Sequence, residues 1–197
     1  RSAYPSDYGL QYSIVRRDED KVLLLGLNSA WQLDHHFKGR AGFHSGAIAN
    51  ALTDVRAQAS REEQWLRIAV WHHPVGRGVT EQVSPDVISR FAINGFQFGI
   101  HGHIHEAHKS IHAYDEVFKL HLITCGTFGA PVSQWVSGIP LQYNLLSYDP
   151  DARTIRVDSR KREKLDGPWM ADARFGHRGT APQPYYGVRL SDLTIFY

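Results

Sequence analysis

Short apolar runs alternate with segments of helical periodicity in the first half of the chain, and this alternation constrains the fold more than any other sequence feature. Apolar runs of strand length occur in KVLLLGLNSAW (21–31), WLRIAVWHHP (65–74) and FQFGIHGHIH (96–105). Short apolar runs that end at a glycine, a proline or a polar segment are typical of buried strands. The polar segment QLDHHFKGRAGF (32–43) is expected to be a loop.

Two helices are predicted between these strands. Residues 45–60 place three apolar side chains at helical spacing: Ile48, Leu52 and Val55. Ser45 is the expected N-cap of this helix. Residues 85–96 predict a second helix, with Pro85 near its first turn and Gly95 at its end. The resulting order is strand, helix, strand, helix, strand.

The second half of the chain reads mainly as further strands. SIHAYD (110–115) and VFKLHLITCGTF (117–128) predict two of them, and LQYNLLSYD (141–149) with TIRVDSRKR (154–162) predicts a hairpin across the PDA turn. We therefore expect an α/β fold with an antiparallel finish, that is, the α+β class.

The two ends of the chain are less regular. Residues 1–13 are expected to form an irregular entry with Pro5 and Gly9. Residues 161–197 lack clear periodicity, and we expect an extended tail that packs on a domain spanning residues 1–160.

Composition excludes several classes of protein. Twenty-two Lys and Arg against twenty Asp and Glu leave a formal charge of +2, so no strong field selects a nucleic-acid or membrane partner. The one cysteine, Cys125, excludes a disulfide framework and cysteine-rich zinc modules, and it is expected to be a buried, inert thiol. No apolar run reaches the roughly 20 residues of a membrane span. We expect a cytoplasmic protein. A chain that opens on Arg1 suggests a processed product, an engineered piece or the later part of something longer.

Histidines follow two of the predicted strands. His72 and His73 come directly after an apolar run and precede Pro74, while GIHGHIHEAH (99–108) contains four histidines, including His103 and His105. Strand ends of open α/β sheets are where ligands bind, and histidine is the commonest metal ligand among side chains. Gly102 would let the backbone turn sharply or come close to a ligand, and the His-x-His spacing lets two imidazoles converge on one centre or on two metals. The joint pattern therefore favours a metal site.

This joint pattern resembles the fourth and fifth signature motifs of the calcineurin-like metallophosphoesterase superfamily. LLGLNSAW and GTFGAP…LQYNLL are similar to a bacterial branch often found within multidomain proteins, and the resemblance covers roughly residues 8 to 160. It implies a two-metal centre (Mn, Fe, Zn or Ni, with Mn favoured) in which His72 and His103 bind one metal and His105 the other. Alignment on the following proline favours His72 over His73 as the ligand, which leaves His73 beside the metal or the substrate as a catalytic partner.

The carboxylate motifs of this superfamily are missing. Its members begin with Asp-x-His, Gly-Asp-x-x-Asp and Gly-Asn-His-Asp/Glu, whereas this sequence has neither a Gly-Asp pair nor Gly-Asn-His, and its one Asp-x-His, DHH (34–36), follows the wrong strand. The resemblance therefore implies the C-terminal half of a four-layer αββα sandwich. The N-terminal half must come from elsewhere in the same chain or from a partner chain. Three neutral imidazoles cannot neutralise two divalent cations, so this chain alone should bind metal weakly and hydrolyse nothing.

Two functions remain open on this evidence. One is a metal-dependent phosphoesterase that acts on a phosphodiester, such as a nucleic acid, a nucleotide or a small molecule. The other is a non-catalytic scaffold or sensor module of a larger assembly, with a degenerate or structural metal site.

Four further residues are expected near the substrate: Asn28, Asp34, His35 and His36. For Asp34 and its two histidine neighbours, local turn contacts in a polar loop are at least as well supported. His101 is expected to be packed or hydrogen-bonded within its strand. The remaining histidines carry no pattern: His44, His108, His112, His121 and His177.

Overall fold

The computed structural model describes residues 5–37, 39–59, 64–76, 80–104, 107–113, 118–129, 138–173, 175 and 181–190. The chain divides into two compact units. The first contains residues 1–103, 110–123 and 192–197, and the second contains residues 104–109 and 124–191. The fold is mixed, with two sheets and two α-helices in the described part of the chain, so the predicted α+β class is confirmed. The prediction of a domain over 1–160 with a tail over 161–197 stays a prediction.

A six-stranded sheet with the order β1-β2-β3-β4-β6-β5 organises the first unit. Its strands are β1 (Tyr12–Arg17), β2 (Val22–Leu27), β3 (Leu66–Val70), β4 (Phe98–His101), β5 (His108–Ala113) and β6 (Lys119–Thr124). The central strands β2, β3 and β4 run parallel, and β1 pairs antiparallel to β2 at one edge. The carboxyl ends of β2, β3 and β4 therefore lie along the same edge of the sheet.

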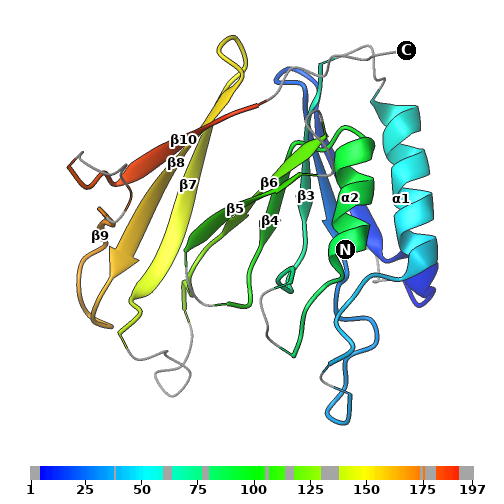
Figure 1. The fold of residues 1–197 in the computed structure, drawn as a ribbon, viewed down its shortest axis with the longest axis horizontal. Coiled ribbons are helices and arrows are strands. Elements are labelled where there is room, and N and C mark those ends of the chain that lie inside the picture. The colour runs from blue at the N-terminus through cyan, green and yellow to red at the C-terminus, as the bar shows by residue number, and fades with distance from the viewer. Residues whose placement is uncertain are drawn as a thin grey trace. The chain divides into compact units, whose positions relative to one another are not determined.

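The two helices connect the parallel strands and cover one face of the sheet. Helix α1 (Ser45–Gln58) lies between β2 and β3 in the chain, and α2 (Pro85–Ile93) lies between β3 and β4. Figure 1 shows both on the same side of these strands. Successive strand residues point to opposite faces, which is why burial alternates along β2. Its helix-facing residues join side chains from both helices in one core: Leu23, Leu25, Leu27, Ile48, Leu52, Val55, Ile88 and Phe91.

A buried arginine on β3 joins the ends of the two helices. The side chain of Arg67 is 1% exposed, and its guanidinium donates to the carbonyl of Ala59 at 2.9 Å and to that of Asn94 at 2.7 Å. These two residues are the C-caps of α1 and α2. A cation at helix C-termini satisfies carbonyls that lack partners within the helix and offsets the negative end of the helix dipole. The charge in this buried strand is therefore a structural clamp.

The structure changes several local expectations. Residues 1–13 were expected to be irregular, but a 3₁₀ helix occupies Tyr8–Leu10, and β1 begins at Tyr12. The N-cap expected at Ser45 is wrong: His44 is the N-cap of α1, and its side chain makes no capping hydrogen bond. At the second helix, Pro85 occupies the first turn as predicted, and the hydroxyl of Ser84 accepts the N–H of Asp86. Gly95 ends this helix with a φ of 78°, a conformation that favours glycine.

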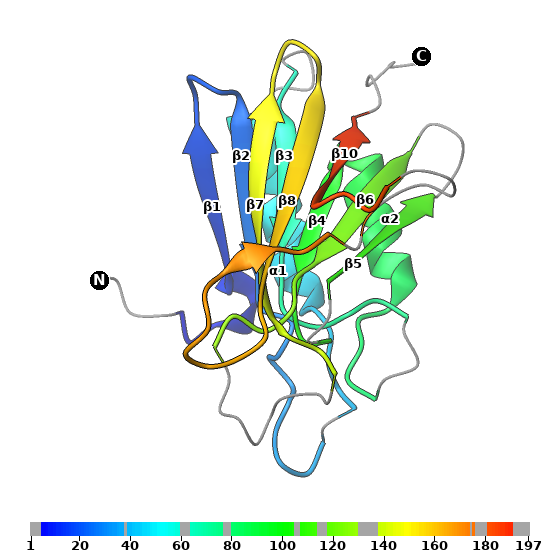
Figure 2. The ribbon, with the colours of Figure 1, turned by 90° about the vertical axis from the view of Figure 1, so that its left-hand side faces the viewer.

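The second unit is built on an antiparallel sheet with the order β10-β8-β7, with β9 also paired to β8. Its strands are β7 (Leu141–Asp149), β8 (Thr154–Arg162), β9 (Met170–Ala171) and β10 (Tyr185–Arg189). The first two form the predicted hairpin, with Leu141 opposite Arg162 and Asp149 opposite Thr154 (Figure 2). The segment without clear periodicity thus contributes two short strands to this sheet. Cys125, expected to be buried, is of intermediate exposure, and burial of its thiol raises the pKa to about 11.

Candidate metal site

The histidines predicted as ligands lie where parallel strands end. His72 and His73 follow β3, and His103 follows β4. Backbone pairing between the two strands continues to this point, because the N–H of Trp71 donates to Ile100 and that of Gly102 donates to His72, at 3.1 and 3.0 Å. Two neighbouring strands thus fix the spacing of the histidine side chains.

His72, His73 and His103 form a cluster in which one ring nitrogen of each lies within 4.8 Å of the others. The closest pair is Nε2 of His72 and Nδ1 of His103, 3.3 Å apart. Two metal–nitrogen bonds of about 2.0–2.1 Å at a tetrahedral angle would place their nitrogens about 3.4 Å apart. The spacing of this pair therefore matches that of two ligands of one metal ion.

Ser29, which follows β2, determines how His73 is oriented. Its hydroxyl oxygen accepts the backbone N–H groups of His72 and His73, each at 3.2 Å, and lies 2.8 Å from Nδ1 of His73. A serine oxygen has two lone pairs and one proton. Because both lone pairs accept backbone N–H groups, this arrangement favours the neutral form of His73 in which Nδ1 accepts the hydroxyl proton and Nε2 carries the ring proton. His73 is thereby arranged to donate a hydrogen bond from Nε2.

His73 is also kept neutral by its surroundings. The residue is 3% exposed, and burial, together with the charges of His72 and His103, lowers the pKa of its imidazole to about 4. The nearby Glu81 and a hydrogen bond to the backbone of Ser29 oppose this shift but do not reverse it. At neutral pH the ring is therefore uncharged.

Trp71 supports the cluster from within the core. Its indole Nε1 donates to the carbonyl of His73 at 2.7 Å, and its ring stacks against His101 with centroids 5.7 Å apart. A Cβ added at Gly99 would lie 2.8 Å from Trp71 Cη2 and 2.5 Å from Leu122 Cδ2. Glycine at that position of β4 therefore leaves the space that the tryptophan occupies.

The turn that carries His103 differs from the one expected. We expected Gly102 to supply the sharp turn, but the positive φ falls on His103, at 70°. A Cβ at Gly102 would make only ordinary van der Waals contact, 3.5 Å from Nδ1 of His72. Histidine is one of the residue types enriched in this left-handed region, and strained backbone tends to occur at functional sites. The His103 ring lies beside His72, with ring centroids 5.2 Å apart.

A carboxylate that the sequence did not reveal lies beside His103. Oε2 of Glu81 is 3.3 Å from Nε2 of His103, and both side chains are 27% exposed. Glu81 lies between β3 and α2 and belongs to no recognisable motif, so only the three-dimensional structure shows its position. Ser29 was missed for the same reason, although it directly follows Asn28.

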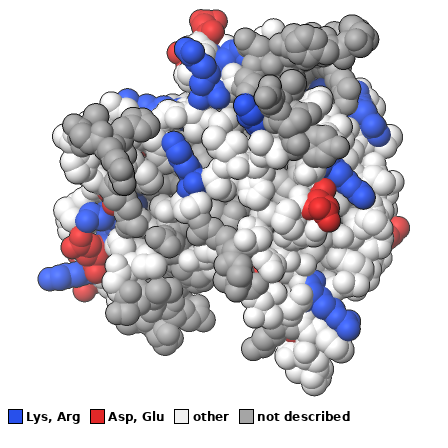
Figure 3. All heavy atoms as spheres, in the orientation of Figure 1, with Lys and Arg blue, Asp and Glu red and all other residues white. Residues whose placement is uncertain are grey.

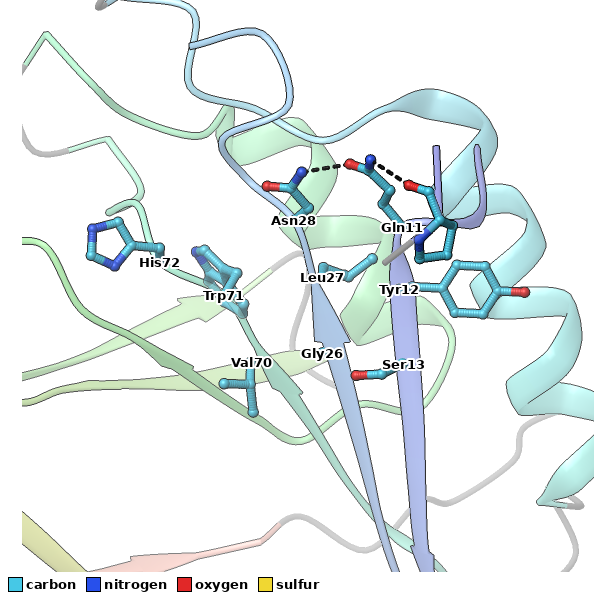
Figure 4. A pocket seen from close by; sticks show the side chains of 10 residues that line it. Gln11, Tyr12, Ser13, Gly26, Leu27, Asn28, Val70, Trp71 and His72 are labelled. Carbon is cyan, nitrogen blue, oxygen red and sulfur yellow. Dashed lines mark hydrogen bonds between the residues drawn. The ribbon is translucent and has the colours of Figure 1, made fainter. Parts of the chain in front are cut away.

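Asn28 lies in a cavity next to His72, as Figure 4 shows. The cavity measures about 730 Å³. The side chain of Asn28 donates to Oε1 of Gln11 at 2.6 Å and accepts the N–H of Ala30 at 2.8 Å. Gln11 thus holds the amide of Asn28, and Trp71 and His72 line the same cavity.

The other predicted site residues do not join the histidine cluster. Asp34 takes the local role considered above, because its Oδ1 accepts the backbone N–H groups of His36 and Phe37 at 2.7 and 2.8 Å. The exposed rings of His35 and His36 contact each other, with centroids 3.8 Å apart. His105, the predicted ligand of the second metal, lies outside the described residues.

The comparisons with known proteins define no family. No protein-family model matches the chain, and no curated protein matches it. Among solved structures the chain is similar to one described as "GAP50 the anchor in the inner membrane complex of Plasmodium", with a TM-score of 0.46 and 13% sequence identity. The alignment covers 91% of this chain and 53% of that chain, so this chain spans about half the length of that protein. No helix in the described part of the chain has the length and apolar character to cross a membrane.

Proposed function

We propose that this chain supplies the histidine side of a metal-dependent phosphoesterase centre. The observation that carries the proposal is the convergence of His72, His73 and His103 at the ends of two neighbouring parallel strands. His72 and His103 are the proposed ligands, because their facing nitrogens are spaced as two ligands of one ion. A bound divalent metal supplies Lewis-acid polarisation of a phosphoryl oxygen and lowers the pKa of a bound water.

The other residues of the site act on the substrate and on the ligands. His73, protonated on Nε2, donates to a phosphoryl oxygen and stabilises the charge that develops there. Ser29 holds that ring in the donating form, and Trp71 fixes the backbone carbonyl beside it. Asn28, held by Gln11, offers a polar contact at the rim of the adjacent cavity.

The chain does not carry every part that this chemistry needs. We propose that it is the C-terminal half of a four-layer αββα sandwich and that the N-terminal half supplies the bridging carboxylates and closes a two-metal centre. In that centre His105 binds the second ion. The nitrogen donors alone favour Zn, Fe or Ni, whereas the Mn that the resemblance favours needs carboxylate oxygens from the other half.

The substrate class follows from the reaction that such a centre performs, namely attack of an activated water on a phosphodiester. Lys and Arg are scattered among uncharged residues on the face drawn in Figure 3, and the chain carries a formal charge of only +2. A small phosphodiester or a nucleotide therefore fits as well as a nucleic acid, which is held mainly through cationic contacts to its backbone.

Metal binding and hydrolysis test this proposal separately. Isothermal titration of Zn²⁺, Mn²⁺ or Co²⁺ into the chain should show a site that His72→Ala and His103→Ala each weaken strongly. His112→Ala, which changes a half-buried histidine outside the cluster, is the matched control and should bind as the wild type does. The full-length protein should hydrolyse bis-p-nitrophenyl phosphate, and His103→Ala should abolish this activity. Unchanged metal content in both ligand variants would refute the proposal.

A non-catalytic module is the second candidate, favoured by the missing carboxylate motifs in this sequence. In that case the chain binds metal through the same histidines, but the full-length protein hydrolyses no phosphodiester with any of the four metals. The titration and the hydrolysis assay together therefore separate the two functions.

A further inference from the structure

We propose that Glu81 is a positioning residue that fixes the ring orientation and the protonated nitrogen of His103. This inference rests on the proposed metal site and assigns an anionic partner from within this chain. Sequence reasoning placed all the carboxylates of the centre in the missing half, whereas Oε2 of Glu81 lies 3.3 Å from Nε2 of His103.

The two nitrogens of His103 face different partners. Nε2 faces the carboxylate of Glu81, and Nδ1 lies 3.3 Å from Nε2 of His72. A neutral imidazole has one N–H and one lone pair. A carboxylate can only accept, so the N–H of His103 is drawn to Nε2, and the lone pair is left on Nδ1. That lone pair then points toward His72, where the metal is proposed to bind.

Glu81 stands outside the ligand set. The group of side chains whose ligand atoms all lie within 4.8 Å of one another contains the three histidines and no described carboxylate. A carboxylate that accepts the second N–H of a metal-binding histidine fixes its tautomer and raises its basicity as a ligand. With both side chains only 27% exposed, the contact is also less screened by water than a surface ion pair.

The segment that carries Glu81 is anchored on its C-terminal side. Val83, which is 0% exposed, donates its N–H to the carbonyl of Pro74 at 2.7 Å and forms a bridge with Val75. The next residue, Ser84, is the N-cap of α2. Glu81 therefore lies two residues before Val83, which is bonded to the segment that directly follows His73. Its position is fixed by this attachment.

The protonation of His103 provides a test that does not depend on metal. Long-range ¹H–¹⁵N correlation spectra of the metal-free protein should show His103 with its proton on Nε2. Glu81→Gln keeps the size of the side chain and a hydrogen-bond acceptor but removes the charge. Glu81→Ala removes the acceptor as well as the charge. The population of the Nε2-protonated form of His103 should therefore decrease in Glu81→Gln and decrease further in Glu81→Ala. Glu81→Asp should partly restore it. Glu163→Gln, which changes an exposed glutamate paired with Lys161, is the matched control.

Metal affinity provides the second readout. Zn²⁺ titration should show a loss of about tenfold for Glu81→Gln and up to about a hundredfold for Glu81→Ala, with the control unchanged. An unaltered tautomer and affinity in both variants would overturn the role of Glu81 and leave the proposed function standing. A loss in Glu81→Ala as large as in His103→Ala would also overturn it, because Glu81 would then be a ligand. If the wild type binds no metal while the tautomer still depends on Glu81, the proposed function fails and the positioning contact survives.

Discussion

The substitution Gly99→Ala should destabilise the protein through the tryptophan that supports the histidine cluster. The added Cβ would lie 2.5 Å from Leu122 Cδ2, and 2.8 and 3.1 Å from Cη2 and Cζ3 of Trp71. The leucine end can turn away, but the indole is held by its hydrogen bond to the carbonyl of His73 and by stacking on Phe91 and His101. Relief of the clash therefore requires movement of a ring that is fixed on three sides.

The expected cost combines three terms. Overpacking a well-packed core costs about 1–3 kcal/mol, and weakening the hydrogen bond from Trp71 to His73 costs about 1 kcal/mol more. Replacing glycine by alanine in a strand returns about 0.5–1 kcal/mol, because the unfolded chain loses freedom. We expect a net loss of about 2 kcal/mol in the free energy of unfolding.

Urea unfolding followed by far-UV circular dichroism measures this change. Gly187→Ala is the matched control, because Gly187 also lies in a strand but a Cβ there would meet nothing within 4 Å. The control should be neutral or stabilised by about 0.5 kcal/mol. Equal stabilities for the two variants would refute the packing argument, since a Cβ meets Trp71 and Leu122 at Gly99 and nothing within 4 Å at Gly187. Zn²⁺ titration of Gly99→Ala should also show weaker binding, because displacement of Trp71 moves the backbone of His73.

Two further predictions concern titratable groups. The pKa of folded His73 is about 4 and that of an unfolded histidine about 6.5, so the unfolded state binds more protons between these values. The melting temperature followed by circular dichroism should therefore fall as the pH drops from about 6.5 to 4. In His73→Asn the melting temperature should depend less on pH over this range. An equally steep dependence in this variant would contradict the assigned pKa of His73. The thiol of Cys125 has a pKa of about 11, so its labelling by iodoacetamide at pH 8 should be roughly a hundredfold slower than that of an exposed cysteine. The labelling rate should increase above pH 9. Fast labelling at pH 8 would instead show an accessible thiolate and contradict the raised pKa.

Local patterns predicted the central elements of the fold well and its edges poorly. The apolar runs before His72 and His103 are strands, because strands buried on both faces leave continuous apolar sequence. β1 escaped prediction because it is an edge strand that is largely exposed, with YSIVRR mixing apolar and charged residues. Arg67 could not be interpreted from sequence, since its partners are backbone carbonyls at residues 59 and 94, which only the packed helices bring together.

The candidate site divides in the same way. Its histidines were found because their spacing follows the strands. Alignment on the following proline favours His72 over His73 as the ligand but does not settle the choice. The alternation of strand side chains separates them: Trp71 and His73 are buried, whereas His72 between them is exposed at the sheet edge. Ser29 and Glu81 act through single contacts to residues distant in the chain, and neither lies in a motif that could mark it.

Glu81 also changes the charge balance of the proposed centre. Three neutral imidazoles and one neighbouring carboxylate place a single negative charge beside the cluster formed by His72, His73 and His103. One divalent cation at that cluster is then half neutralised, which is compatible with weak binding by the chain alone. Two divalent cations would leave an excess of about three positive charges, which desolvated nitrogen ligands cannot offset. This chain is therefore expected to hold one metal ion by itself and a second only when carboxylates from another segment complete the site.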